Sequence, residues 1–399
     1  MTKKHHATPA PPISKLGFGC MRLPLVAGSK DIDVEAATAM LDYAYAHGVN
    51  YFDTAWGYLS GQSEPFVGSV LKKFPRDSFY LASKMPGWLL PDLSGARKLF
   101  ADQLERCQVG YFDYYLLHSL STREEFDRLY VKEKVLAELH REKKSGRIRQ
   151  FGFSFHGPLA LMRYLLDEFS WDFVQIQLNY LDWDLQNARV LYEMAQARNL
   201  PCIIMEPVRG GALATLNDKA AAILRQAAPG RSLASWAIRY AASLPGALTV
   251  LSGMSTREQL LDNLATMADF QPITETERAT LQQALAAYLQ APPILCTTCG
   301  YCLPCPFGVD IPGNFGLYNK AVGKRLLSDL EQADAETAAL KCSELLKLWE
   351  TMPPAALAGQ CRSCGKCVPK CPQHIAIPER LQELQNLLAE ARKQQPATP

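Results

Sequence analysis

The sequence lacks a long apolar run, an apolar leader and an excess of charge of one sign. No apolar stretch is uninterrupted over the length that a bilayer span requires, so we expect no membrane-spanning segment. The start, MTKKHHATPAPP, is basic but lacks the apolar stretch of a signal peptide. The formal net charge is +2 over 399 residues, which gives no argument for a nucleic-acid or membrane partner. We therefore expect a cytoplasmic protein.

Cysteine is the residue type with an informative distribution. The chain has 12 cysteines, and most of them fall in two short runs near the C-terminus. A disulfide framework would need an oxidising compartment, to which the sequence shows no route. The four scattered cysteines are expected to be buried, unreactive thiols; they are Cys20, Cys107, Cys202 and Cys342.

The two runs, CTTCGYCLPCP and CRSCGKCVPKCP, have the spacing of iron–sulfur ligands. In each run three cysteines follow one another at two-residue intervals, and a fourth precedes a proline. Three such thiolates can converge on one cube, and in two-cluster ferredoxins the fourth ligates the other cluster. We therefore expect two [4Fe–4S] clusters, with Cys371 joining the first run and Cys305 the second. The predicted ligands are Cys296, Cys299, Cys302, Cys305, Cys361, Cys364, Cys367 and Cys371.

Zinc is the competing interpretation, because all-cysteine zinc sites also use C-x2-C pairs. Such a site typically takes two pairs. It does not explain three evenly spaced cysteines and a Cys-Pro, occurring twice. The pattern therefore favours iron–sulfur clusters.

The composition changes at about Ala291, where the Pro-rich run YLQAPPILC follows a helical segment. We expect one domain over residues 1–290 and a second over residues 291–399. The gap between the cysteine runs is 361 − 305 = 56 positions, and its segment KRLLSDLEQADAETAALKCSELLKLWETM has apolar residues at helical spacing. A small, mainly helical ferredoxin-like domain is therefore expected.

The first 290 residues alternate strand-like and helical segments. Helical candidates include VEAATAMLDYAYAHG and EFDRLYVKEKVLAELHREKKSG. Alternation of this kind implies a parallel sheet covered by helices, and eight repeats fit an α/β fold of the (β/α)8 TIM-barrel type. A doubly wound sheet is disfavoured because no G-x-G-x-x-G turn follows the first strand. The strand candidates are LGFGC, NYFDTA, FYLASK, YFDYYLLH, RQFGFSF, FVQIQLNY, PCIIMEP and LTVLSGM.

Four polar side chains follow successive strand candidates. Catalytic residues of such barrels sit at the C-terminal ends of strands. Asp53, Lys84 and His118 stand at three of these ends, and Tyr58 follows in the adjoining loop. Taken singly, each is more simply a cap, a surface cation, a core histidine or a packing residue. An acid, a phenol, an amine and an imidazole at the same end of neighbouring strands predict a catalytic site.

The strings DTAWGY, SEPFVGSVL, FGFSF, QIQLN and GMSTREQLLDN resemble the aldo-keto reductase family. The C-terminal part resembles the subset of that family with an appended dicluster ferredoxin domain. The resemblance implies a tetrad of Asp53, Tyr58, Lys84 and His118. Tyr58 would donate the proton to the carbonyl oxygen, its pKa lowered by the Lys84 charge, and His118 would orient the carbonyl.

The resemblance also implies a nicotinamide cofactor, with NADPH preferred over NADH. Phe155 stands where many members have Asn, and Met205 stands where many have an aromatic that stacks on the nicotinamide. Arg257 would replace a missing Lys–Arg pair at the 2′-phosphate. The implied cofactor residues are Ser154, Gln175 and Met205 at the nicotinamide end, and Gly253, Ser255, Arg257, Gln259 and Asn263 at the adenosine and phosphate end.

Two function classes follow from these patterns. The first is an NAD(P)H-dependent oxidoreductase that reduces an aldehyde or ketone, with two [4Fe–4S] clusters for electron transfer or regulation. The second is an electron-transfer or redox-sensing iron–sulfur protein on a barrel scaffold. Hydride transfer moves two electrons, whereas each cluster passes one electron at a time. The sequence shows no flavin-binding fingerprint, and a flavin usually mediates between the two. A structural or docking role for the clusters is therefore the alternative. The expected partners are a small carbonyl substrate and a redox protein.

Overall fold

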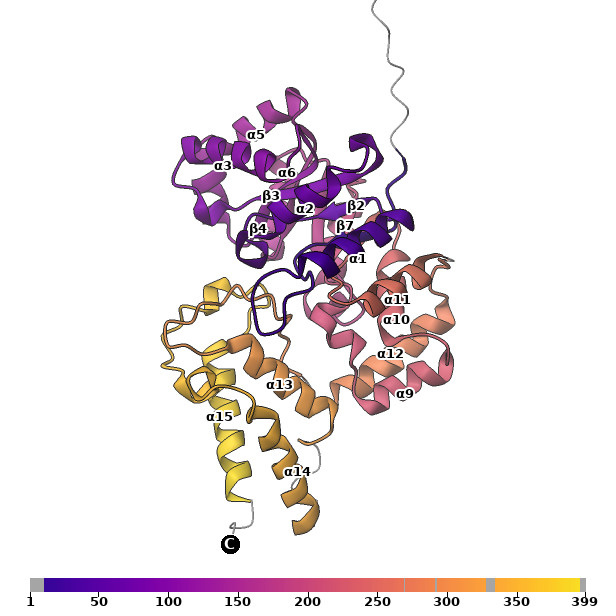
Figure 1. The fold of residues 1–399 in the computed structure, drawn as a ribbon, viewed down its shortest axis with the longest axis vertical. Helices are drawn as coiled ribbons and strands as arrows, with labels where there is room; N and C mark the ends of the chain where they lie inside the picture. The colour runs from indigo at the N-terminus through magenta and orange to yellow at the C-terminus, as the bar shows by residue number, and fades with distance from the viewer. Residues whose placement is uncertain (1–10, 269, 291–292, 328–333, 395–399) are drawn as a thin grey trace, which may run out of the picture. The chain divides into compact units, whose positions relative to one another are not determined.

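The computed structural model describes residues 11–268, 270–290, 293–327 and 334–394 (Figure 1). The expected junction at Ala291 and most of the basic start lie outside the described residues. Within the described ranges, no helix combines the length and apolar character that crossing a membrane requires.

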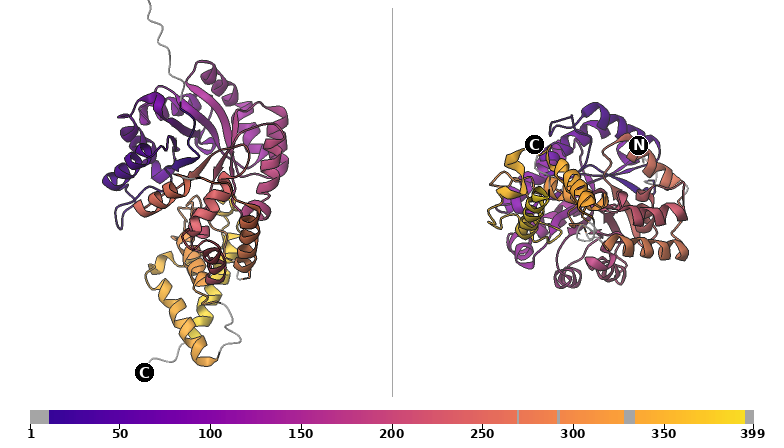
Figure 2. Two further views of the ribbon diagram at one scale, coloured as in Figure 1. Left: turned by 90° about the vertical axis from the view of Figure 1, so that its right-hand side faces the viewer. Right: turned by 90° about the horizontal axis from the view of Figure 1, so that it is seen from below.

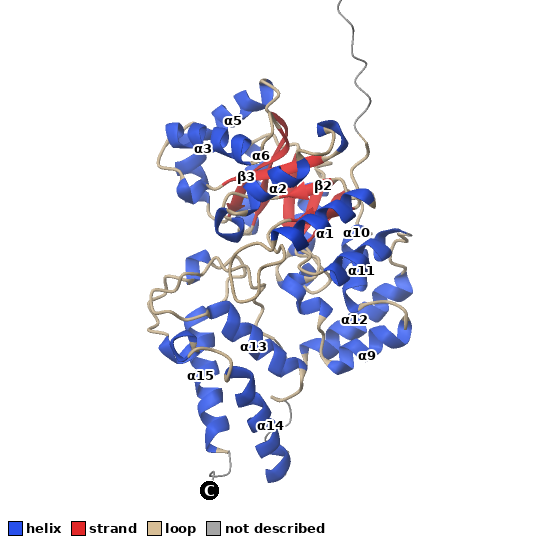
Figure 3. Ribbon diagram, in the orientation of Figure 1, coloured by secondary structure: helices blue, strands red, loops and turns tan. Residues whose placement is uncertain are grey.

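Eight parallel strands close into a barrel in chain order (Figure 3). The barrel closes where Leu16 of the first strand pairs with Val250 of the last. The strands are nearly continuous apolar runs because both faces of the sheet are buried. This confirms the (β/α)8 prediction. The strands are β1 (Leu16–Gly19), β2 (Tyr51–Asp53), β3 (Tyr80–Met85), β4 (Phe112–Leu120), β5 (Ile148–Phe155), β6 (Phe173–Gln177), β7 (Cys202–Met205) and β8 (Ala247–Ser252).

One principal helix follows each strand, and these helices surround the barrel (Figure 2). The first is typical: Asp33 caps its N-terminus by accepting from the Ala36 amide, and Met40 and Leu41 lie on its buried face. The principal helices are α1 (Val34–Ala46), α2 (Ser63–Leu71), α3 (Leu93–Arg106), α5 (Val135–Lys144), α6 (Leu159–Glu168), α8 (Ala188–Gln196), α10 (Leu233–Ala242) and α11 (Arg257–Ala268).

The helix expected over residues 125–146 is interrupted. A short helix α4 (Arg123–Phe126) continues into a π-helical turn, Asp127–Lys132, and α5 begins only after Lys134 adopts a left-handed φ of 59°. The wider turn buries Tyr130, whose hydroxyl donates to the Met85 carbonyl at 3.3 Å. Burial of this apolar face therefore overrides helical continuity.

The described contacts divide the chain into two compact units. The first is Met1–Pro207 with Ala237–Ile273, and the second is Val208–Trp236 with Thr274–Pro399. The loop after β7 thus belongs with the C-terminal residues, a grouping that the sequence did not indicate. The domain boundary at residue 290 stays a prediction. The second unit contains α9 (Asp218–Ala227), α12 (Glu275–Leu289), α13 (Ile311–Gly323), α14 (Ala335–Trp349) and α15 (Ile377–Lys393), while a one-turn α7 (Asp182–Leu185) belongs to the first.

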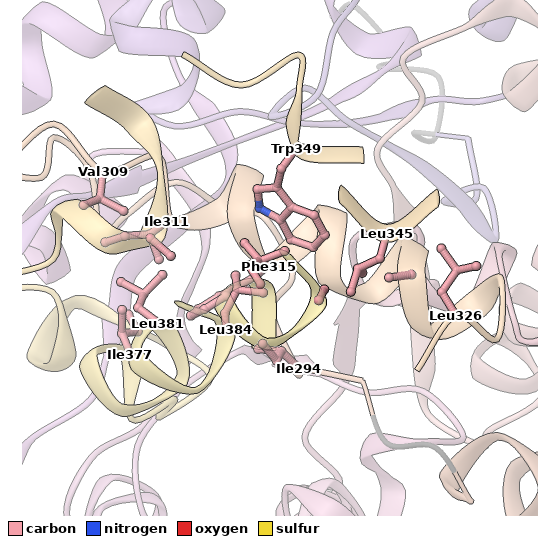
Figure 4. Close-up of a cluster of buried hydrophobic side chains, with 14 of the residues drawn as sticks. Ile294, Val309, Ile311, Phe315, Leu326, Leu345, Trp349, Ile377, Leu381 and Leu384 are labelled. Atoms are coloured by element: carbon pink, nitrogen blue, oxygen red, sulfur yellow. The ribbon is translucent and has the colours of Figure 1, made fainter. Parts of the chain in front are cut away.

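The C-terminal helices α13, α14 and α15 enclose an apolar core (Figure 4). Phe315, Leu345 and Leu381 are among its most buried members. The buried Asn314 side chain accepts from the Trp349 indole at 3.2 Å, which joins two of these helices. Six of the eight cysteines of the two runs pack against this core. The mainly helical ferredoxin-like expectation is confirmed.

Candidate active site and cysteine sites

Three members of the expected tetrad lie on neighbouring strands, and all are buried. Asp53 ends β2 and pairs in register with Ala82 of β3, which places Lys84 close to it. Lys84 Nζ donates to Asp53 Oδ1 at 2.6 Å and to the Thr54 carbonyl at 2.8 Å. His118 lies on β4, the next strand. The structure therefore brings an acid, an amine and an imidazole to the same end of the barrel.

Tyr58 completes the group from the loop after β2. Lys84 Nζ lies 4.6 Å from the centre of the Tyr58 ring. The Tyr58 and His118 rings meet edge to face, with centroids 5.9 Å apart. Trp88, half exposed in the loop after β3, has its ring centroid 4.9 Å from that of His118.

Burial governs the electrostatics of the tetrad. It lowers the pKa of Lys84 and raises the pKa of Asp53, and the attraction between the two opposes both shifts. Burial also raises the pKa of Tyr58 well above its usual value, and the Asp53 charge adds to the rise. The sequence predicted that Lys84 lowers the pKa of Tyr58, and the structure does not show this. The Lys84 charge is already balanced by Asp53. Burial, followed by repulsion from Lys84, holds the pKa of His118 well below its usual value.

For the carbonyl reduction that the sequence predicts, these directions imply a flat pH profile. His118 should stay neutral above its ordinary pKa of 6.5, and Tyr58 should keep its proton at least up to the ordinary phenol value of 10.0. We expect kcat/KM to be level between these two values, since neither essential protonation state changes there. Measurement of kcat/KM against pH tests this. An alkaline fall that begins near neutrality would contradict the raised Tyr58 pKa.

A buried polar network lies behind the tetrad, and sequence reasoning did not find it. The Glu64 carboxylate accepts from Ser83 Oγ and from Gln103 Nε2, both at 2.6 Å, while the same Gln103 nitrogen donates to the Lys84 carbonyl at 3.0 Å. Arg106 Nε donates to Glu64 Oε2 at 2.9 Å. Glu64 stands in the quoted string SEPFVGSVL, but nothing in the sequence of α3 singled out Gln103 or Arg106.

The network also supports the turn that carries Tyr58. The three residues after Tyr58 have positive φ angles of 52°, 56° and 89°, a left-handed path that non-glycine residues rarely adopt. Arg106 donates to the Gly61 carbonyl at the end of this turn. Its guanidinium also lies 4.2 Å from the centre of the Trp56 ring. Arg106 therefore fixes the turn at both of its ends.

The residues expected at the nicotinamide end lie on adjacent strands. Ser154 of β5 pairs in register with Gln175 of β6. Ser154 Oγ accepts from the Ser119 amide at 2.7 Å, and Gln175 Nε2 donates to the Met205 sulfur at 3.4 Å. Gln175 Oε1 is buried, and among the described residues it has no hydrogen-bond partner. An open, buried acceptor fits the amide hydrogens of a nicotinamide carboxamide.

The residues expected at the adenosine and phosphate end gather in the loop after β8 and in α11. The Ser255 amide donates to Gln259 Oε1 at 2.7 Å, and Asn263 Nδ2 donates to Ser252 Oγ at 2.8 Å. Gly253 begins this loop, and a Cβ there would lie 3.0 Å from the side chain of Arg22. Gln259 and Asn263 therefore shape the loop, while Arg257 at the start of α11 supplies its positive charge.

The cysteines of the two runs line two cavities. Cys296, Cys299 and Cys302 share the first with Cys371. The second, of about 170 Å³, is lined by Cys302 and by Cys305, Cys361, Cys364 and Cys367. Cys371 of the second run thus lies with the first run, and Cys305 of the first run lies with the second, as an exchange of the fourth cysteines between the runs would require. Within the described ranges, no three His, Cys, Asp or Glu side chains are placed to hold a single metal ion.

The two cysteine loops repeat one backbone conformation. Thr298 and Ser363, each two positions after the first cysteine of its run, have φ angles of 54° and 49°. Their amides donate to the sulfurs of Cys296 and Cys361 at 3.3 and 3.4 Å. Amide donors directed at thiolate sulfur are a means by which proteins tune cluster potentials. The repeat therefore suits two similar sulfur-ligated groups.

The two cysteine groups differ in exposure. Burial raises the pKa of Cys296 to about 11 and that of Cys302 to about 12. In the other group Cys364 is exposed. The four scattered cysteines are all buried, and burial raises the pKa of each thiol. Cys364 is therefore the one exposed cysteine of the two groups.

A buried arginine lies beside the first cysteine group. Arg209, in the loop after β7, is only 1% exposed and donates to Gln373 Oε1 at 3.1 Å, two positions after Cys371. Its neighbour Gly210 has a φ of +63°, and a Cβ there would lie 2.4 Å from the Thr297 carbonyl oxygen. The loop is therefore packed directly against the residue that follows Cys296.

Replacement of Arg209 should change the reduction potential of one cluster. Reduction adds negative charge to a cluster, and a buried positive charge beside it favours that state. We expect Arg209→Gln to lower the reduction potential of the cluster predicted in the Cys296 group and to leave that of the other cluster unchanged. Arg209→Lys keeps the positive charge and should largely retain the wild-type potential. An anaerobic redox titration followed by electron paramagnetic resonance measures both. Equal shifts of both clusters, or no shift, would refute the local effect.

The fold and the site define a class of protein: a (β/α)8 oxidoreductase with a cysteine-rich helical module. A family model for the aldo/keto reductase family matches residues 15–286, and a model for the 4Fe-4S dicluster domain matches residues 295–377. The chain belongs to the aldo/keto reductase family.

Individual relatives support this assignment. The chain is 25% identical over 312 residues to an uncharacterized oxidoreductase, YqkF, of Bacillus subtilis, covering 71% of this chain and 96% of that protein. It is 29% identical over 159 residues to a probable aldo-keto reductase 1 of Glycine max, covering 38% of this chain and less than half (44%) of that relative. An aldo-keto reductase structure from Bacillus halodurans superposes with a TM-score of 0.57 at 26% identity, over 68% of this chain and 92% of that one.

Proposed function

We propose that this oxidoreductase reduces an aldehyde or ketone with a nicotinamide cofactor, and that Tyr58 donates the proton. The observation that carries the proposal is the buried group at the strand ends, in which Lys84 is bonded to Asp53 and lies over the Tyr58 ring. The open Gln175 acceptor on β6 supports a nicotinamide bound at the same end of the barrel.

The roles follow from protonation states. Tyr58, with its raised pKa, holds a proton that it can deliver to the carbonyl oxygen as negative charge develops there. Neutral His118 can donate a hydrogen bond to the same oxygen and orient the carbonyl. Asp53 holds the Lys84 ammonium in place beside the ring of the phenol. A bound nicotinamide supplies the hydride.

We propose NADPH as the preferred cofactor, with NADH as the alternative. The Ser154 and Gln175 pair would hold the carboxamide, and Met205 would lie against the ring. The Gly253–Asn263 segment would hold the adenosine and phosphate end. Arg257 is the cation in that segment that suits a 2′-phosphate.

We also propose that the C-terminal domain, over residues 291–399, holds two [4Fe–4S] clusters that transfer electrons or regulate the reductase. In support of this proposal, Cys371 lines the first cavity and Cys305 lines the second, while Cys302 lines both. When bound, such clusters accept and release single electrons. The chain's own contribution is the amide donors to Cys296 and Cys361, and the buried Arg209.

A substrate screen tests the proposed activity. The protein is purified anaerobically with its clusters, and aldehydes and ketones are offered with NADPH and with NADH. We expect carbonyl-dependent oxidation of the cofactor, faster with NADPH. Removing the Arg257 charge by Arg257→Gln should raise the KM for NADPH more than the KM for NADH. Failure of a folded, cluster-loaded protein to bind either cofactor would contradict the proposal.

A further inference from the structure

The second cysteine group opens onto a basic surface. Its cavity is lined by Arg362, Lys366 and Lys370, which we call the basic rim. All three side chains are exposed. Among the described residues, none of the three forms an ion pair or a side-chain hydrogen bond. Their charges are therefore not neutralised within the described part of the chain.

Acidic residues are absent from both cysteine-bearing segments. Residues 361–378 contain the basic rim and His374 but no Asp or Glu, and residues 295–309 contain no charged residue. The first acid after the shorter segment is Asp310, whose carboxylate caps α13 by accepting from the Gly313 amide at 3.0 Å. The other side chains of the two segments therefore carry a charge of +3 at neutral pH, with His counted as neutral and the cysteines and their cluster left out of the count.

Large apolar side chains are exposed beside this charge. Leu303 and Phe307 are 37% and 44% exposed, and Val368 is 40% exposed. Protein–protein interfaces combine an apolar centre with a polar rim, whereas surfaces that bind nucleic acid are far more uniformly polar and basic. The adjoining Cys364 is exposed, so a partner seated here would lie within a few residues of cluster sulfur.

We propose that this face docks an acidic one-electron carrier protein, which exchanges electrons with the cluster of Cys305, Cys361, Cys364 and Cys367. The proposal rests on the two-cluster assignment. In each encounter the reduced carrier loses one electron and the cluster gains one, or the reverse; no bond is made or broken. Complementary charge accelerates such an encounter and makes it dependent on ionic strength.

The test uses the full-length, cluster-loaded protein and a small acidic [2Fe–2S] ferredoxin reduced with dithionite, the excess of which is removed. Stopped-flow absorbance measures the second-order rate of cluster reduction at several ionic strengths. We expect the wild-type rate to fall steeply with salt. The variant Arg362→Gln/Lys366→Gln/Lys370→Gln should react at least about tenfold more slowly at low salt, and it should converge with wild type at high salt.

A matched control removes three exposed lysines elsewhere in the same module: Lys320→Gln/Lys324→Gln/Lys347→Gln. It changes the net charge equally and should stay within about twofold of wild type, because these lysines do not line the cavity of the second cysteine group. Iron content and resonance spectra, measured first, separate loss of a cluster from loss of docking. A rate that is independent of salt, or an equal loss in the control and basic-rim variants, would overturn the docking surface while leaving the cluster assignment intact.

Discussion

Tyr58→Phe should lower the rate of carbonyl reduction by about 10²–10⁴-fold, the range typical for a lost general acid. The substitution removes only the hydroxyl, and the Tyr58 ring keeps its edge-to-face contact with His118 and its place over Lys84. Packing and cofactor affinity should therefore hardly change. Turnover with a saturating carbonyl, together with the dissociation constant of NADPH from fluorescence titration, measures the two effects separately.

Tyr130→Phe is the matched control for this prediction. Tyr130 is also buried, and its hydroxyl donates to the Met85 carbonyl rather than to any tetrad residue. The control removes a buried phenol oxygen and should keep turnover within a few fold of wild type. Reduction at a near wild-type rate in Tyr58→Phe would reject Tyr58 as the donor.

Cys371→Ala should remove the cluster of the first cysteine run, although Cys371 belongs to the second run in sequence. Iron and acid-labile sulfide should fall from about eight of each per chain to about four. The physical reason is the shared cavity of Cys371 with Cys296, Cys299 and Cys302. Colorimetric iron and sulfide analysis of anaerobically purified protein measures the change.

Paired variants distinguish an exchange of the fourth cysteines between the two runs from an arrangement in which each run ligates its own cluster. Cys371→Ala combined with Cys299→Ala should still retain about four irons, because both changes affect one cluster. Cys371→Ala combined with Cys364→Ala should lose both clusters. The reverse pattern would show that each run ligates its own cluster. Cys342→Ala, a buried module cysteine outside both runs, should keep the full content.

The barrel was predictable because its signals are local. Each strand is a short, mostly apolar run, and Asp53, Lys84 and His118 lie at or near the C-terminal ends of three of them. The Cys-Pro endings predicted an exchange that agrees with where the structure places Cys371 and Cys305. These inferences needed only spacing and the geometry of parallel strands.

The remaining features depend on contacts between distant residues. Arg209 meets Gln373 across 164 positions, and Gln103 meets Glu64 across 39. No periodicity marks such pairs in advance. The raised Tyr58 pKa was also missed, because proximity to Lys84 is visible in the family pattern whereas full burial and the nearby Asp53 charge are not. Lys134 breaks the expected helix with a left-handed backbone conformation, and the sequence did not indicate this because no glycine stands at that position.

Transfer of a deuterium label from the cofactor to the substrate is the most direct test of the proposed carbonyl reduction. Cluster-loaded protein is given NADPH deuterated at the transferred C4 position, with a carbonyl substrate from the screen, under anaerobic conditions. We expect one deuterium on the former carbonyl carbon of the alcohol product, and a much lower rate of deuterium transfer in Tyr58→Phe. Oxidation of the cofactor that reduces the clusters without placing deuterium on any carbonyl product would contradict the proposed carbonyl reduction.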